Sequence, residues 1–117
     1  MKLSTRARYH AHVVSVKGRV LGSVHKDAWN QTVASLGEGT NLIIDLAETD
    51  FMDSSAIGMF INTAKRTRAE GGDVVLANLK TRIKNLFLMT RLLGEVFPSY
   101  DSLDEAEQHF HAEAPTA

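Results

Sequence analysis

Residues 42–58 read LIIDLAETDFMDSSAIG, and this stretch decides the fold that the sequence predicts. Its first part, Leu42–Leu46, is a short and almost continuous apolar run, which is typical of a strand buried on both faces of a parallel sheet. Its last part indicates a helix that begins near Ser54, because Asp53 is a favourable residue for the position immediately before a helix. The stretch therefore predicts a buried strand that leads directly into a helix.

The predicted helix after Asp53 has one apolar face, and Gly71-Gly72 ends its pattern. We expect this face to pack on the sheet; its residues are Ile57, Phe60, Ile61 and Ala64. We expect the other side of the helix to face solvent; it carries Ala56, Met59, Asn62 and Thr63.

Outside this stretch, strand-type and helix-type patterns alternate along the chain. The predicted strands are His12–Val20, Val74–Ala77 and a short one that opens at Val96-Phe97, and a further N-terminal strand around Arg6–Tyr9 is left open. The predicted helices are Lys26–Leu36, one from about Ile83 to Thr90 that has ended by Gly94, and one that begins after Ser102, where Ser102 and Glu105 form a capping box. Helices between strands require crossover connections. The sequence therefore predicts an α/β fold with one mostly parallel sheet of four to five strands and about four helices.

The composition predicts one globular domain. The chain has 117 residues, of which 44% are apolar and 23% are charged, as in ordinary soluble proteins. We expect the domain to span residues 1–117, with a core at about residues 9–111 and loose ends at Lys2–Arg8 and Ala112–Ala117. The absence of cysteine excludes a disulfide scaffold and a thiol nucleophile. No apolar run approaches the roughly 20 residues that span a bilayer, and no secretory signal is evident, so we expect a cytoplasmic protein without membrane insertion.

Charge is distributed in blocks, although the net charge is only −1. Residues 1–26 carry only basic charges and residues 27–64 only acidic ones, while residues 65–91 are mainly basic and residues 92–117 only acidic. Such blocks either steer a partner or form solvated faces that neutralise one another in the fold. The balance is far from the strongly basic one of a nucleic-acid-binding protein, so we expect no direct contact with nucleic acid.

The junction between the buried strand and the following helix is the segment richest in chemistry. If Asp53 precedes the helix, Ser54 lies in its first turn, where free backbone N–H groups and the helix dipole favour an anion. A phosphate on Ser54 would add about −1.5 to −2 charges, which the helix end tolerates but an acidic partner surface does not. The alternative is that Asp53-Ser54-Ser55 serves only as a helix cap.

Catalysis is not predicted at this junction. A nucleophile elbow needs glycine two residues before and after the serine, but these positions hold Met52 and Ala56. A glycine-rich phosphate loop is also missing. The pairs His10/His12 and His109/His111 have no third ligand at a recognised spacing. We therefore expect no catalytic residue, no metal site and no cofactor.

Residues 42–58 resemble the STAS domain family, specifically the bacterial anti-sigma factor antagonists. In these proteins a strand ending in Asp-Leu is followed by Phe-Met-Asp-Ser-Ser/Thr-Gly-aliphatic-Gly at a helix start, and Asp45-Leu46 and Phe51–Gly58 match in order and spacing. The resemblance covers about residues 10–110. Two departures are that Ala56 replaces the usual glycine and that residues 18–21 lack both acidic residues of the family's Gly-Glu-Leu/Ile-Asp turn.

The resemblance implies a single STAS-like domain that acts as a phosphorylation-switched protein-binding module. Ser54 matches the serine that is phosphorylated by the anti-sigma factor, a GHKL-type ATP-binding kinase. The unmodified protein would bind this kinase and so free a sigma factor, and a PP2C-type phosphatase would reset the phosphorylated form. We expect the contact surface to comprise Asp53, Ser54, Ser55, Ala56, Met59, Asn62 and Thr63, with Met59 incompletely buried in the free protein.

Two alternatives to this function stay open. In the first, the chain is a STAS subunit of a larger assembly, such as a stressosome-type or lipid-transporter complex, in which Ser54 has a structural role. In the second, it is a small-ligand or nucleotide-binding domain that uses the same helix N-terminus.

Overall fold

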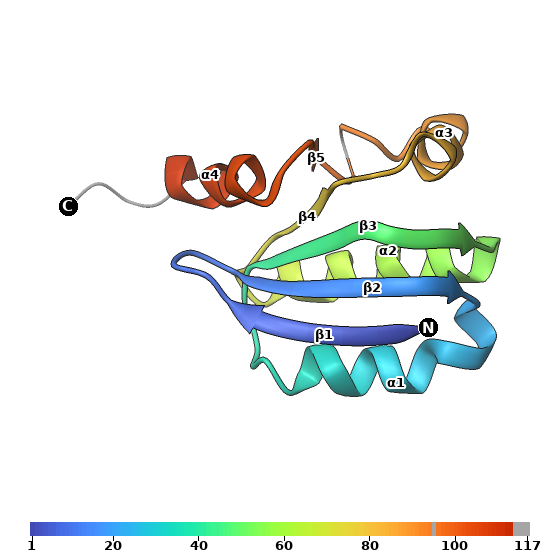
Figure 1. The fold of residues 1–117 in the computed structure, drawn as a ribbon. Helices are drawn as coiled ribbons and strands as arrows, with labels where there is room; N and C mark the ends of the chain where they lie inside the picture. Colours follow the sequence, from blue (N-terminus) through green and yellow to red (C-terminus); the bar gives the residue numbers. More distant parts are fainter. Residues whose placement is uncertain (95, 114–117) are drawn as a thin grey trace.

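The computed structural model describes residues 1–94 and 96–113, and these form a five-stranded sheet with four helices (Figure 1). The elements are, in chain order, β1 (Lys2–Ala7), β2 (His12–Val20), α1 (Gly22–Ala34), β3 (Leu42–Met52), α2 (Ser54–Ala69), β4 (Val74–Ala77), α3 (Thr81–Met89), β5 (Ser99–Tyr100) and α4 (Leu103–Glu113). The strands lie in the order β1-β2-β3-β4-β5, and β1 alone runs antiparallel to its neighbour. The predicted α/β class and the mostly parallel sheet are confirmed.

The N-terminal end is not loose, contrary to the expectation for Lys2–Arg8. Lys2–Ala7 forms β1, which pairs in antiparallel register with the first part of β2, from Lys2 opposite Lys17 to Ala7 opposite His12. Most of the β1 side chains are exposed, and Leu3 packs against the core. An edge strand held mainly through its backbone has no strong apolar alternation, which explains why the sequence pattern placed this strand at Arg6–Tyr9.

Further boundaries also differ from the prediction. Strand β3 continues to Met52 rather than ending at Leu46. Helix α1 begins at Gly22 rather than Lys26. The last strand is Ser99–Tyr100, whereas Phe97 forms only an isolated bridge with Leu93 and is fully buried. The apolar pair at 96–97 therefore marks a core position that directly precedes the strand.

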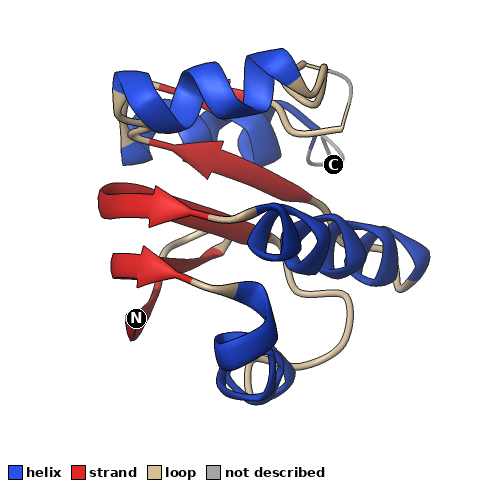
Figure 2. Cartoon of the chain, turned by 90° about the vertical axis from the view of Figure 1, so that its right-hand side faces the viewer, coloured by secondary structure: helices blue, strands red, loops and turns tan. Residues whose placement is uncertain are grey.

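The two faces of the sheet are covered by different helices. Alternate residues of the central strands point to opposite sides, so that Val14 and Ile44 belong to the cluster with α1 and α2, while Val13 and Ile43 belong to the cluster with α4. In Figure 1, α1 lies at the bottom of the molecule and α4 at the top. Figure 2 shows from the side that helices flank the twisted sheet. None of the helices within the described residues is long and apolar enough to cross a membrane.

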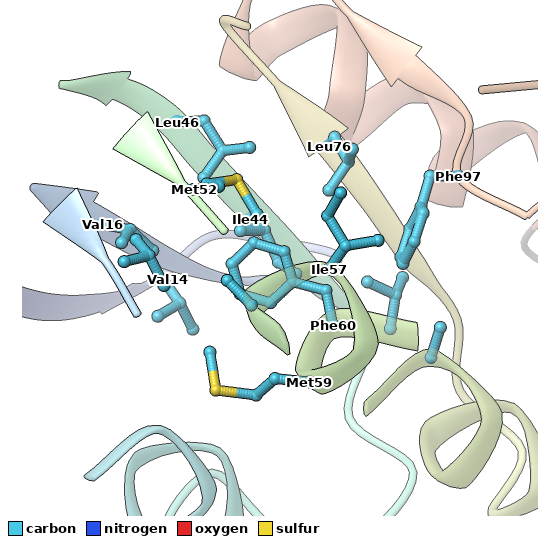
Figure 3. Close-up of a cluster of buried hydrophobic side chains, with 14 of the residues drawn as sticks. Val14, Val16, Ile44, Leu46, Met52, Ile57, Met59, Phe60, Leu76 and Phe97 are labelled. Atoms are coloured by element: carbon cyan, nitrogen blue, oxygen red, sulfur yellow. The ribbon is translucent and has the colours of Figure 1, made fainter. Parts of the chain in front are cut away.

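The larger of the two clusters lies between the sheet and the helices α1, α2 and α3 (Figure 3). Trp29 of α1 and Phe60 of α2 are fully buried there, with ring centroids 4.8 Å apart. The indole Nε1 of Trp29 donates a hydrogen bond of 2.7 Å to the Thr63 hydroxyl. Helices α1 and α2 are therefore packed against each other as well as against the sheet.

Candidate functional site

Asp53 connects the starts of two helices. It precedes α2 with extended backbone angles, and its Oδ1 accepts a hydrogen bond from the Ala56 N–H at 2.8 Å, as predicted for a helix cap. The same oxygen accepts from the Gly22 N–H at 3.1 Å and from the Ser55 hydroxyl at 2.8 Å. The Gly22 N–H is the main cause that holds the pKa of Asp53 below its ordinary value, and the bonds from Ser55 and Ala56 act in the same direction against the cost of desolvation. The carboxylate is therefore charged at neutral pH, and its Oδ1 accepts all three of these hydrogen bonds.

The two adjacent serines differ in what they contact. The Ser55 hydroxyl donates to Asp53 and accepts from the Ser23 N–H at 3.2 Å, so it completes the cap of α1. The Ser54 side chain is exposed, and its hydroxyl has no hydrogen-bond partner within the described part of the chain. Ser54 is thus the serine that an incoming group can reach without breaking a contact.

Helix α1 depends on α2 for its N-terminal capping. Leu21 precedes α1 and provides no side-chain cap, and the N–H groups of Gly22 and Ser23 bond instead to Asp53 and Ser55. The backbones approach so closely that a Cβ atom on Gly22 would lie 2.2 Å from the Ser55 carbonyl carbon. Only glycine fits this position, and the starts of the two helices form one rigid unit.

The predicted contact surface on α2 is wrong for three residues. Ala56 and Thr63 are fully buried, and Met59 is 7% exposed inside the apolar cluster, next to Phe60 in Figure 3. The physical reason is that α1 covers this side of α2, so α2 buries two sides rather than one. Asn62 remains exposed, as expected.

Two exposed apolar side chains lie at the same end of the molecule, and the sequence pattern did not single them out. Val24, in the first turn of α1, is 69% exposed, and Phe51, near the end of β3, is 38% exposed. The Arg19 guanidinium lies 5.0 Å from the Phe51 ring centroid, across the β2–β3 pair. The sequence does carry a sign of this exposure, because Phe51 is a bulky aromatic residue in a segment of mostly acidic and polar residues.

The histidines of the two pairs whose side chains the structure describes lie away from this end, whereas Lys80 pairs with Asp50 of β3 close to it. His109 hydrogen-bonds with Tyr100 and lies 3.0 Å from an Asp73 oxygen, while the His111 side chain lies outside the described residues. Within the described residues, no group of three or more histidines or carboxylates is arranged to hold a metal ion. Among the basic residues, Arg68 is bound to Asp73 and Lys65 is exposed.

Comparisons with known proteins agree on one family. A family model described as "STAS domain" matches residues 2–106. An anti-sigma-B factor antagonist of Bacillus subtilis is 38% identical over 55 residues, which are 47% of this chain and 50% of that protein. The chain thus spans about half the length of the curated relatives it matches.

Solved structures with the same fold have lower identity. A crystal structure of an anti-sigma factor antagonist from Mycobacterium paratuberculosis has a TM-score of 0.79 at 22% identity, covering 94% of this chain and 93% of that one. The Bacillus protein SpoIIAA in its phosphorylated form has a TM-score of 0.65 at 16% identity, covering 92% of this chain and 98% of that one.

Proposed function

This chain belongs to the STAS domain family, and on that premise we propose that it is an anti-sigma factor antagonist. Unmodified, it binds an anti-sigma factor and thereby frees a sigma factor. Phosphorylation of Ser54 ends this binding. Support comes from the antagonist relative that is 38% identical over 55 residues, and from a serine at the matching position of the motif.

The observation that carries the proposal is the difference between the two serines. Ser54 is exposed at the N-terminus of α2 with no hydroxyl partner in the described residues, whereas Ser55 is bonded to Asp53 and Ser23. A kinase that modified Ser55 would have to break its hydrogen bond to Asp53 and its bond from the Ser23 N–H, which caps α1. A kinase that modifies Ser54 breaks nothing, and the helix N-terminus favours the added negative charge.

The phosphate acts through charge at the interface. On Ser54 it would lie next to the Asp53 carboxylate, whose pKa is lowered and which is therefore charged. A partner docked over these residues would have to bury a second negative group without a counter-charge, which costs several kcal/mol. Each 1.4 kcal/mol is a factor of ten in affinity, so the modification abolishes binding while the fold persists.

The contact surface that we propose differs from the one expected from the sequence. It keeps Asp53, Ser54, Ser55 and Asn62, and it replaces the three buried α2 residues by the exposed apolar side chains Val24 and Phe51. Apart from Asn62, which lies in the middle of α2, these groups lie at the end of the molecule where the two helices begin. Apolar side chains ringed by polar groups are a common arrangement at protein interfaces.

The partners that we propose follow the family pattern. The anti-sigma factor is a GHKL-type kinase, which supplies the phosphate from ATP, and a PP2C-type phosphatase removes it. The chain contributes no catalytic residue, and it acts in the cytoplasm without entering the membrane or contacting nucleic acid.

Phosphorylation by the cognate kinase tests this function. We expect mass spectrometry after incubation with the kinase and ATP to place one phosphate on Ser54, and none on the Ser54→Ala protein. Ser54→Asp should lose most of its affinity for the kinase at an unchanged melting temperature. Ser55→Thr is the matched control, because it keeps a hydroxyl beside Asp53. Phosphate on Ser55 would contradict the proposal.

A further inference from the structure

A groove separates α1 and α2 next to the Ser54 end of the molecule. It encloses about 260 Å³. The residues that line it are Gly22, Ser23, Lys26 and Asn30 of α1 and Ser55, Gly58, Met59 and Asn62 of α2. Ser55 belongs both to this groove and to the proposed contact surface, so the groove continues that surface along the helices.

The groove has a positive character. Among the described residues that line it, Lys26 is the only charged one. Lys26 is exposed and forms no ion pair within the described part of the chain. Both helices also begin at this end, and their N-termini carry partial positive charge. Asp53 precedes Ser54 and keeps its negative charge, but it does not line the groove.

The groove also has free space above its floor. A Cβ atom on Gly58 would meet no other atom within 4 Å, and the nearly buried Met59 forms part of the floor. The polar groups of Ser23, Asn30 and Asn62 surround this space. A side chain of moderate length can therefore enter between the helices.

We infer that this groove receives an acidic side chain of the anti-sigma factor, which pairs with Lys26. The inference rests on the proposed function, because the groove continues the surface that the kinase would cover. Charge complementarity selects the occupant: the lining is neutral apart from Lys26, so a carboxylate gains an ion pair there, while a basic side chain is repelled by the same charge.

The inferred contact also gives the switch a second effect. Ser54 directly precedes the groove residue Ser55, so a phosphate on Ser54 stands at the mouth of the groove. There it repels an approaching carboxylate and attracts Lys26. Phosphorylation would thus remove an attractive contact in addition to creating a repulsive one.

Charge removal at Lys26 tests the inference. The probe is the full-length GHKL-type kinase from the same genome, titrated into the complete unmodified chain by calorimetry. We expect Lys26→Gln to bind on the order of tenfold more weakly and Lys26→Glu more weakly still. The affinity of Lys26→Gln should also fall less steeply as salt rises. Lys65→Gln, which removes an exposed cation of α2 outside the groove, should stay within about twofold of the wild type.

A second variant fills the groove without changing its charge. Gly58→Met should weaken kinase binding and leave the melting temperature unchanged or higher, because glycine within a helix is less favourable than methionine. If the wild type binds the kinase and the Lys26 and Gly58 variants bind equally well, the groove inference is wrong and the proposed function stands. If the wild type binds no GHKL-type kinase, the proposed function itself is overturned.

Discussion

The two faces of the sheet are held together in different ways. On the α1 and α2 face, a large apolar cluster includes the fully buried rings of Trp29 and Phe60. On the α4 face, the apolar cluster is smaller. Among the described residues, Phe110 is its one buried aromatic side chain. Because the candidate site is built from the starts of α1 and α2, it lies on the face that is secured by apolar burial.

Several contacts between charged or ionisable side chains hold α4 against the rest of the molecule. Arg8 pairs with Glu107 at 3.0 Å and also contacts Asp104. His109 lies 3.0 Å from Asp73, which is bound to Arg68 at 2.7 Å. Changes in pH and salt concentration should therefore weaken the packing of α4 before they alter the candidate site.

The largest expected effect comes from removing one aromatic ring on each face. Phe60→Ala should lower the free energy of unfolding by about 3–5 kcal/mol, because it leaves a cavity in a fully packed cluster. Phe110→Ala should cost about 2 kcal/mol, because a smaller cluster at the edge of the molecule can relax around the cavity. Urea unfolding measures both. If both variants lose the same free energy of unfolding, apolar burial contributes equally to the two faces and the distinction between them is wrong.

A negative charge placed on the buried side of α2 should cost far more stability than one placed on its exposed side. Met59→Glu should cost about 3 kcal/mol, because it replaces a nearly buried thioether by a carboxylate. Asn62→Glu, three residues further along the same helix and exposed, is the matched control and should change stability by less than about 0.5 kcal/mol. If Met59→Glu is as stable as the control, α1 does not cover this side of α2 in solution.

Acid should loosen the α4 face. Burial alone raises the pKa of Asp73, but hydrogen bonds from Arg68, His109 and the Val74 N–H outweigh it, so the pKa lies below its ordinary value. A lowered pKa means that the charged form stabilises the fold above the ordinary carboxyl pKa of about 4, and that this contribution is lost as the pH falls below it through the lowered pKa of the folded state. Asp73→Asn should lose about 1–2 kcal/mol at pH 7 and show a flatter decline in acid. Unfolding measured at several pH values tests this, and a decline as steep as in the wild type contradicts it.

The smallest expected effect concerns two ion pairs of different exposure. Glu107→Gln should lower stability by about 0.5–1 kcal/mol, since Glu107 is mostly buried and accepts from both Arg8 and the His10 N–H. Glu48→Gln should have almost no effect, because Glu48 and Lys17 are 4.0 Å apart and both well exposed. The melting temperatures of the two variants test this. If both shift by the same amount, burial does not make the Arg8–Glu107 pair more stabilising than the Lys17–Glu48 pair.

Much of the fold could be predicted because its central strands are strongly patterned. The predicted bounds of β2 and β4 and the start of α2 agree with the structure. The start of α1 at Gly22 could not be predicted, because the groups that cap it, Asp53 and Ser55, lie about thirty residues away in the chain. A local pattern carries no information on a cap of this kind.

The candidate site could be predicted only in part. The cap by Asp53 and the position of Ser54 in the first turn of α2 followed from local residue preferences. The burial of Met59 and Thr63 did not, because periodicity indicates that a helix has an apolar side but not how many neighbours cover it. Trp29 was the available sign that α1 needs a partner, since so large a ring requires cover from more than the sheet.

The contact between Trp29 and Thr63 gives the protein an intrinsic optical probe. Trp29 is the single tryptophan of the chain, and it lies in the seam between the two helices that form the candidate site. Its fluorescence therefore reports on this seam alone, without background from other indoles. Entry of water between α1 and α2 would shift the emission to longer wavelengths, so kinase binding and phosphorylation can be followed in real time on the unlabelled chain.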